Sequence, residues 1–238
     1  SSTTTLLDAT NNEAPIEAIA ALKPDLIVAT GFYGLDAAYA DLSKIAPTIA
    51  DTSIPAGDTW QERLTMVGKA LGRASDAQKA IDAGQSAIQE TKDTYPALAG
   101  KTFSLSLLFA PGQIATIYSE SDFAVNFFEA LGLKVTPDLA NLTPFSATNT
   151  SAPVSMEQVN LLDADLMIMA FSTSDLQQSF ESNALVQSLG AVKSSHYFTV
   201  DLETVSALRF PSPLAIPWIL EKLAPAFAAC IVRLTGPR

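Results

Sequence analysis

ALKPDLIVATGFYG, residues 21 to 34, joins a buried-strand pattern to an aromatic loop and decides the fold class of this sequence. A Pro-Asp pair leads into an apolar run, Leu26 to Ala29, which predicts a strand buried on both faces, as parallel sheets have. The run breaks at once into TGFYG, where two aromatics lie between two glycines. Ligands of open α/β sheets bind just beyond the carboxyl ends of the strands. We therefore expect Phe32 and Tyr33 to contact a ligand.

A second segment repeats this pattern 140 positions further along, from Glu17 to Glu157. EAIAALKPDLIVATGF and EQVNLLDADLMIMAFS share the Glu, an Ile or Val two residues on, a Leu five residues on, and an Asp-Leu pair before an apolar run. Each segment predicts a short helix that leads into a buried strand. The pair indicates two related α/β halves, and a chance match between two helix–strand units is the alternative.

A long amphipathic helix is predicted between the two halves, from Asp76 to Tyr95. Its apolar or small residues recur at spacings of three and four, which is the helical period. They are Ala77, Ile81, Gly84, Ile88, Thr91 and Tyr95. A helix of this length spans ~30 Å, enough to join two lobes, although a helix packed within one domain shows the same pattern.

The remaining segments alternate between strand and helix patterns. DTWQERLTMVGKALG predicts a helix with a capping box at Thr59 and Glu62, and KTFSLSLLFAPG with IATIY predicts two strands joined by a Pro-Gly turn. DFAVNFFEALGL predicts a helix, HYFTV a strand, and PLAIPWILEKLAPAFAAC a last helix broken or kinked at Pro217 and Pro225. The fold class is therefore α/β, with a parallel or mixed sheet in each half.

Composition excludes several classes of function. The chain has 238 residues, 48% of them apolar, and 25 acidic against 14 basic residues give a net charge of −11. This charge disfavours a general role on nucleic acid or on an anionic membrane. Cys230 and His196 are each the single residue of their type, so no intramolecular disulfide and no Cys- or His-rich metal site is expected. Phosphate-loop, dinucleotide, nucleophile-elbow and zinc-protease motifs are absent, and no catalytic residue is assigned.

Aromatic side chains at the ends of predicted elements are the candidate ligand contacts. Core packing is the alternative for each, above all for the tryptophan, which begins a regular helical stripe. The set comprises Phe32, Tyr33, Trp60, Tyr118 and Phe171.

Arg209 is the one basic residue in the apolar, proline-bounded stretch SALRFPSPLAIPW. A buried arginine needs an anionic partner. That partner is either an anionic group of a ligand or a carboxylate of the chain itself, for which Glu203 is the nearest candidate.

Four segments together resemble one known family. EAIAALKPDLIVAT, YADLSKIAPTI, GKTFSLSLLFAPGQIATIYSESDFAVNFFEALGL and LRFPSPLAIPWILEKLAP are similar to the iron-siderophore (class III) substrate-binding proteins of ABC importers, a class that includes haem and cobalamin binders. The resemblance runs from about Glu13 to Pro225. It implies two Rossmann-like α/β lobes joined by a single long helix, with the ligand held in a crevice between them.

The same resemblance implies a division of the chain and a docking surface. Residues 1–75 would form the N-terminal lobe, 76–98 the bridging helix and 99–238 the C-terminal lobe. By this resemblance, the N-terminal lobe would lack the opening βα unit of the family, and the chain would not include the export signal. Family members dock on the permease through one acidic residue per lobe. By alignment these would be Asp36 and either Asp175 or Glu181.

The sequence thus predicts an extracytoplasmic protein, periplasmic or a cell-surface lipoprotein, that captures a ferric siderophore and delivers it to an ABC permease. We expect a monomer with no catalysis and no intrinsic cofactor, since the chelator already fills the coordination sphere of iron. Haem or cobalamin is the alternative ligand, with Tyr33 or Tyr118 as an axial oxygen ligand. An α/β enzyme that uses carboxylates and a tyrosine, and a surface receptor without a transport role, are the rival classes.

Overall fold

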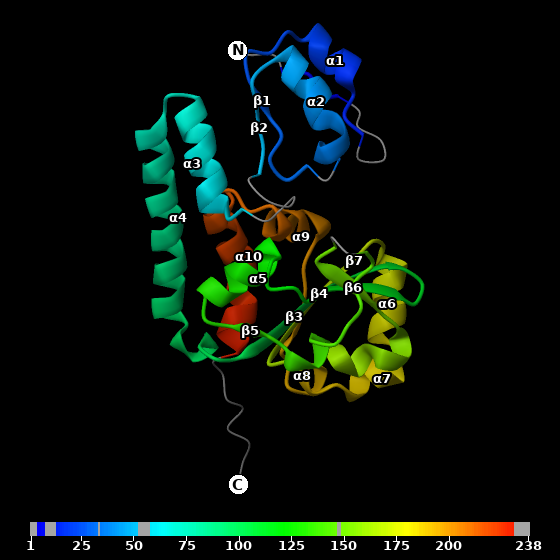
Figure 1. Cartoon of the computed structure of the whole chain (residues 1–238). Coiled ribbons are helices and arrows are strands. Elements are labelled where there is room, and N and C mark those ends of the chain that lie inside the picture. Colours follow the sequence, from blue (N-terminus) through cyan, green and yellow to red (C-terminus); the bar gives the residue numbers. More distant parts are fainter. Residues whose placement is uncertain (1–3, 8–12, 33, 52–57, 147–148, 231–238) are drawn as a thin grey trace. The chain divides into compact units, whose positions relative to one another are not determined.

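The computed structural model describes residues 4–7, 13–32, 34–51, 58–146 and 149–230. It divides into two compact units, Ser1–Lys79 and Ala80–Arg238, and the boundary falls inside the long helix α4 (Ala74–Thr94). Each unit contains both helices and strands, as Figure 1 shows. The predicted α/β class is confirmed, whereas the arrangement of two lobes around a ligand stays a prediction.

The first unit contains a small parallel sheet. The elements of this unit before α4 are α1 (Ile16–Ala21), β1 (Ile27–Val28), α2 (Leu35–Ile45), β2 (Thr48–Ile49) and α3 (Trp60–Ala70). Strand β1 runs parallel to β2, with Ile27 beside Thr48. Ile27 and Ala29 pack with α1 and α2, but Val28, which points to the opposite face, is 49% exposed. The prediction of a strand buried on both faces is therefore wrong here, because no described element covers the second face at Val28.

Two helices confirm the periodicity read from the sequence. At the start of α3, Thr59 and Glu62 form the predicted capping box: the Thr59 backbone N–H donates to Glu62 Oε2 at 2.8 Å. Helix α4 covers the predicted span almost residue for residue. The buried positions along it are those of the predicted stripe, Ala77, Ile81, Gly84 and Ile88. Whether α4 bridges two lobes stays a prediction.

The second unit is built on a mixed sheet. Its strands are β3 (Thr102–Ala110), β4 (Gln113–Ile117), β5 (Lys134–Val135), β6 (Ser151–Val154), β7 (Leu166–Phe171) and β8 (Tyr197–Thr199). Its helices are α5 (Phe123–Ala130), α6 (Ser174–Glu181), α7 (Ala184–Ser188), α8 (Gly190–Lys193), α9 (Leu202–Arg209) and α10 (Ile216–Ala229). Short 3₁₀ helices are η1 (Pro96–Leu98), η2 (Pro137–Leu139) and η3 (Met156–Leu162). The strand order is β6-β4-β3-β7-β8, and β5 pairs with β3.

The central strands β3 and β7 are parallel and bury both faces. Phe103 of β3 packs against Phe128 of α5 on one face, with ring centroids 4.4 Å apart. On the other face, Leu108 and Met169 belong to a core cluster with Phe180 of α6. Helices therefore cover the sheet on both sides in this unit, with α5 and α10 opposite α6 to α8 (Figure 1).

The β3–β4 hairpin confirms the predicted Pro-Gly turn. The strands are antiparallel, with Leu105 opposite Ile117, and Gly112 in the turn has φ of 71°. This left-handed conformation costs glycine little and other residues more. Strand β4 therefore carries the chain back along β3, which decides where Tyr118 lies.

The last helix departs from the prediction at one proline. Pro217 does not break α10 but lies in its first turn, where the missing N–H would have no intrahelical acceptor in any case. Pro225 is inside the helix, which continues to Ala229.

Candidate ligand-binding site

The backbone of Tyr118 and the side chain of Arg209 both contact Thr150 in the second unit, where β4 ends, β6 begins and α9 ends. The Tyr118 backbone N–H donates to the Thr150 carbonyl oxygen at 3.3 Å. Arg209 Nη2 donates to Thr150 Oγ1 at 3.4 Å. Segments far apart in sequence thus meet at Thr150. We name Tyr118, Asp122, Thr150 and Arg209 the Thr150 cluster.

Asp122 is the anionic member of this cluster and was not predicted. It is the N-cap of α5, where its Oδ1 accepts a hydrogen bond from the Ala124 N–H at 2.9 Å. Its Oδ2 accepts a hydrogen bond from Thr150 Oγ1 and lies 3.7 Å from Arg209 Nη2. The carboxylate partner of Arg209 within the chain is therefore Asp122 rather than Glu203. The sequence signal for it was its position just before an apolar helical run.

Arg209 is only partly used by these contacts. Its side chain is 31% exposed, whereas that of Asp122 is 5% exposed. The Arg209 Nε atom is buried and has no hydrogen-bond partner in the described part of the chain. Arg209 also lines a small cavity of about 50 Å³ together with Val205 and Ser151. The exposed part of the guanidinium can therefore donate hydrogen bonds to a bound molecule.

Phe171 does not join the Thr150 cluster. It pairs with Leu108 near the carboxyl end of β3, whereas β4 ends with Ile117 opposite Leu105. The ring of Phe171 packs against Phe180 with a centroid distance of 5.5 Å. Because β4 is antiparallel to β3, it ends at a different point along β3 from β7, although the Tyr118 and Phe171 side chains both pack against the same core cluster. A ligand contact by Phe171 stays a prediction.

In the first unit, an ion pair ties the loop after β1 to β2 and α3. Arg63 Nε lies 2.7 Å from Asp51 Oδ1, and Arg63 Nη2 donates to Asp51 Oδ2 at 3.0 Å. The Gly31 N–H donates to Asp51 Oδ2 at 2.6 Å. Because β1 and β2 are parallel, these residues mark the carboxyl edge of the small sheet, the edge at which such folds bind ligands. Neither Arg63 nor Asp51 was predicted as a site residue from the sequence.

The predicted aromatics of the first unit have separate places. Phe32 is partly buried and lines an apolar cavity of about 250 Å³ with Ile27 and Leu42. Trp60 is the first residue of α3 and is partly buried. Tyr33 lies outside the described residues. Ligand contacts by all three remain predictions.

Another cavity of the second unit, about 400 Å³, lies at the amino ends of β3, β7 and β8, and none of the predicted contacts lines it. Asp163 there accepts hydrogen bonds from the Gly190 and Ala191 N–H groups at 2.7 and 2.8 Å. Asp165 accepts from the Thr102 N–H at 2.8 Å. Although burial opposes it, these bonds and Lys101 hold the pKa of Asp165 below its usual value. Because its carboxylates stabilise the fold and its lining has no aromatic side chain other than His196, this cavity is a poor candidate for the predicted site.

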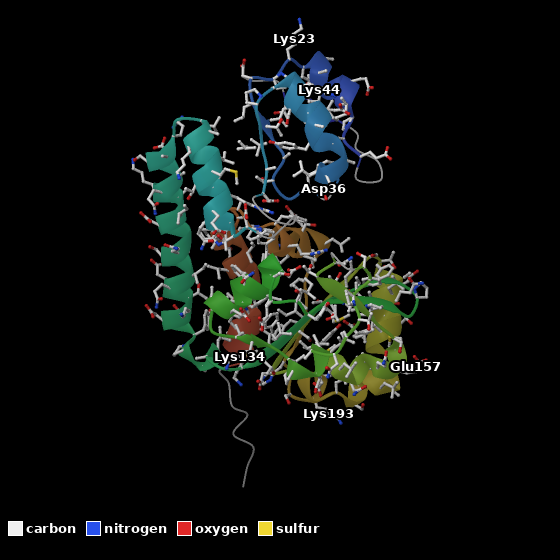
Figure 2. All side chains as sticks on the ribbon, in the orientation of Figure 1. Lys23, Asp36, Lys44, Lys134, Glu157 and Lys193 are labelled. Atoms are coloured by element: carbon white, nitrogen blue, oxygen red, sulfur yellow. The ribbon has the colours of Figure 1, made fainter. Side chains whose placement is uncertain are left out.

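The acidic residues predicted to dock on a permease differ in their surroundings. Asp36 and Asp175 are exposed in the first turns of α2 and α6 (Asp36 is labelled in Figure 2). Glu181 instead ends α6, where its Oε1 accepts from Gln177 Nε2 at 2.9 Å and from the Tyr197 hydroxyl at 3.1 Å. Burial and the Glu181 carboxylate raise the pKa of Tyr197 above its ordinary value, so the hydroxyl keeps its proton. Of the two alternatives in the second unit, Asp175 has the free carboxylate.

The described residues contain neither a metal-binding group nor a membrane-spanning helix. No group of three or more His, Cys, Asp and Glu side chains there is arranged to hold a metal ion. None of the helices described is both long and apolar enough to cross a membrane.

Comparison with known proteins matches residues 9–204 to the family described as "Periplasmic binding protein". The chain belongs to this family. Two relatives in Bacillus subtilis (strain 168) are similar over most of the chain. The "Putative ABC transporter substrate-binding lipoprotein YhfQ" is 29% identical over 201 residues, which is 81% of this chain and 61% of YhfQ. The "Probable siderophore-binding lipoprotein YfiY" is 28% identical over 197 residues, 79% of this chain and 59% of YfiY.

A solved structure supports the same assignment. A periplasmic solute binding protein from Mycobacterium smegmatis superposes with a TM-score of 0.76 and 26% sequence identity. The match covers 93% of this chain and 74% of that protein. The chain spans about three fifths of the length of the Bacillus relatives it matches.

Proposed function

We propose that this chain is the ligand-binding part of an extracytoplasmic substrate-binding protein that captures a ferric siderophore for an ABC permease. Membership of the periplasmic binding protein family supports the binding role. The names of YhfQ and YfiY, an ABC transporter lipoprotein and a probable siderophore-binding lipoprotein, support the importer, the ligand class and the location. The chain would bind its ligand without catalysing a reaction on it.

The Thr150 cluster is the single observation in the structure that carries this proposal. At Thr150 it combines the backbone of Tyr118 with a partly exposed guanidinium, Arg209, while the partly buried Tyr118 ring packs against the core cluster that contains Phe180. A ferric chelate presents apolar carbon surface together with ligand oxygens that accept hydrogen bonds. Tyr118 would pack against the surface, and Arg209 would donate to the oxygens. The chelator fills the coordination sphere of iron, so the protein needs no metal ligand of its own.

In this proposal, Asp36 and Asp175 contact the permease rather than the ligand. Both carboxylates are exposed in the first turn of a helix. Exposed charges contribute little to stability but steer association with an oppositely charged partner. Glu181 is the weaker candidate, because two hydrogen bonds already hold its carboxylate.

A fluorescence screen of the purified chain tests the proposal. Ferric siderophores, the same chelators without iron, haem and cobalamin are each titrated while tryptophan emission is recorded. We expect saturable quenching by a ferric siderophore and weaker quenching by the iron-free chelator. Because Trp60 begins a helix near the carboxyl edge of the small sheet, Trp60→Phe should remove most of the quench, and Trp218→Phe should keep it.

The other ligands give opposite outcomes in the same screen. Haem bound through Tyr118 would produce a visible absorption change that Tyr118→Phe removes, and this result would replace the siderophore by haem. Saturable binding of cobalamin alone would replace it by cobalamin. Turnover of a substrate by the purified chain would favour the α/β enzyme. No saturable binding of any ferric chelate would refute the proposal.

A further inference from the structure

We propose that Asp122 sets the charge preference of the Thr150 cluster, so that the site takes ferric chelates of net charge near zero and disfavours multiply anionic ones. The chemical class is the ferric trishydroxamate, as opposed to the ferric triscatecholate. This inference rests on the proposed function, since it assumes that a ferric chelate binds at the cluster.

Two groups create positive potential at the cluster, and the Asp122 carboxylate lies close to both of them. One is the Arg209 guanidinium, whose Nη2 lies 3.7 Å from Asp122 Oδ2. The other is the amino end of α5, where the Ala124 N–H donates to Asp122 Oδ1 at 2.9 Å. The Asp122 side chain is 5% exposed, so water screens its charge poorly. A single buried carboxylate therefore offsets both attractions for an anion.

The other charges on the same segments are negative. The loop from Tyr118 to Asp122, the start of β6 with Thr150, and helix α9 contain three carboxylates and one guanidinium. These are Glu120, Asp122, Glu203 and Arg209. Lys222, from α10, lies 3.5 Å from Asp201 and is already paired. An anionic ligand at the cluster would therefore meet net repulsion from its surroundings.

The first unit shows the same compensation independently. Its edge cation, Arg63, is held bidentately by Asp51, and the two side chains are 15% and 1% exposed. The Gly31 N–H also donates to this carboxylate. Among the described residues at that edge, the guanidinium is thus matched by a buried anion, as Arg209 is in the second unit.

The net charge of a ferric chelate depends on its chelating groups. Three hydroxamates, each with one negative charge, neutralise ferric iron. Three catecholates carry two charges each and leave an excess of three. A neutral chelate still presents hydroxamate oxygens as acceptors. The exposed part of Arg209 can donate to these, and no net negative charge then approaches Glu120 and Asp122.

The experiment compares the dissociation constants of three ferric chelates for the purified chain: a trishydroxamate, a triscatecholate and citrate. Tryptophan quenching gives the constants at low and at raised ionic strength. We expect the trishydroxamate to bind about tenfold more tightly than the triscatecholate, equivalent to about 1.4 kcal/mol. Raised salt should reduce this difference in affinity, because it screens the repulsion of the anionic chelate.

Asp122→Asn identifies the residue responsible. Asparagine keeps an oxygen that can cap α5 but removes the charge. The ratio of the triscatecholate to the trishydroxamate dissociation constant should therefore fall by about tenfold. Asp138→Asn removes the same charge from an exposed position in η2, outside the segments of the cluster, and is the matched control. In the control variant, the ratio of the two dissociation constants should stay within about twofold of that of the unmodified chain, a change of less than 0.5 kcal/mol by the same conversion. Melting temperatures of both variants establish that they are folded.

Each outcome decides the proposal. A triscatecholate that binds the unmodified chain as tightly as the trishydroxamate overturns the charge preference and leaves the siderophore function intact. A preference that persists in a folded Asp122→Asn variant overturns the role of Asp122. If that variant does not fold, the salt dependence of the unmodified chain decides instead. A complete lack of binding to all three chelates speaks against the proposed function itself.

Discussion

At the scale of single residues, Arg209 shows how one side chain can serve both the fold and a ligand. It contacts Asp122 and Thr150, and yet its side chain remains about one third exposed. The distance of 3.7 Å to Asp122 is long for a hydrogen bond, and Asp122 also accepts bonds from Thr150 and from the Ala124 N–H. Removal of Arg209 would therefore leave Asp122 with two other partners.

We predict that Arg209→Ala weakens binding of a ferric chelate more than it weakens the fold. Loss of a hydrogen bond from a charged donor should cost ~1.5–3 kcal/mol of binding free energy. Loss of a partly exposed ion pair should cost about 1 kcal/mol or less of unfolding free energy. Ligand titration and thermal unfolding of the same variant measure both quantities.

Arg73→Ala is the control, because Arg73, just before α4, is paired with Asp76 in an exposed position. It should change neither quantity beyond error. A large loss of stability in Arg209→Ala with affinity retained would assign Arg209 to the fold alone.

At the scale of elements, α3 and α4 approach each other closely at Gly68. A methyl group built on Gly68 would lie 2.4 Å from Ala77 Cβ, which is too close for two carbon atoms. Gly68 is buried within α3, and Ala77 belongs to the buried stripe of α4. The small residue therefore sets the distance between the two helices.

Gly68→Ala should destabilise the first unit, although alanine favours helix by about 1 kcal/mol over glycine. The clash with Ala77 should outweigh this gain, since overpacking costs ~1–3 kcal/mol. The melting temperature is the measurement. The double variant Gly68→Ala with Ala77→Gly moves the methyl group to the other helix and should recover part of the loss. If Gly68→Ala raises the melting temperature, the helices are not in close contact.

The start of α9 depends on an N-cap carboxylate. Asp201 Oδ1 accepts a hydrogen bond from the Thr204 N–H at 2.7 Å. Hydrogen bonding from Thr204 and the nearby Lys222 lower the pKa of Asp201 below its ordinary value. The folded state thus favours the ionised form, and this stabilisation is present above the ordinary carboxyl pKa and lost as the pH falls through the lowered value.

We predict that Asp201→Ala costs about 1 kcal/mol of stability at neutral pH, the usual cost of losing an N-cap. The difference from the unmodified chain should shrink below about pH 4, where the aspartate becomes protonated. Melting curves across this range measure it. Asp138→Ala, at an exposed position in η2, should show no such trend. A difference that stays constant to low pH would exclude a role for the charge.

At the scale of the whole molecule, binding and delivery are expected to use different surfaces. The Thr150 cluster lies at the end of β4, whereas Asp175 follows β7, whose last residue pairs with Leu108 near the other end of β3. Within the second unit, these two places are separated along the strand direction. A change at one of them should therefore leave the other intact.

Charge reversal at both Asp36 and Asp175 should abolish iron uptake in cells and leave the affinity of the purified protein for its chelate unchanged. The reason is that exposed carboxylates guide association with a partner but do not touch the ligand. Uptake of iron-loaded chelate measures transport in cells, and tryptophan quenching measures the affinity of the purified protein. Glu181→Gln should leave uptake intact. Loss of affinity in the purified double variant would place these residues in the ligand site instead.

The sequence by itself determined the local elements of this protein. The α/β class, the stripe along α4, the capping box of α3 and the Pro-Gly hairpin all follow from periods and turn residues within short segments. Such signals depend on neighbours a few positions away, so they can be read without the fold. The exposed Val28 was misjudged because the cover over a strand comes from other elements.

Only the tertiary structure decided which residues share a site. Tyr118 follows β4 and Phe171 ends β7, and both rings pack against one core cluster, but antiparallel pairing brings only the Tyr118 backbone to Thr150. Asp122 and Arg209 are far apart in the chain and meet through Thr150. These contacts depend on strand order and register, which no local pattern encodes. The sequence could therefore name the arginine, while its partner emerged only when the sheet brought the three segments together.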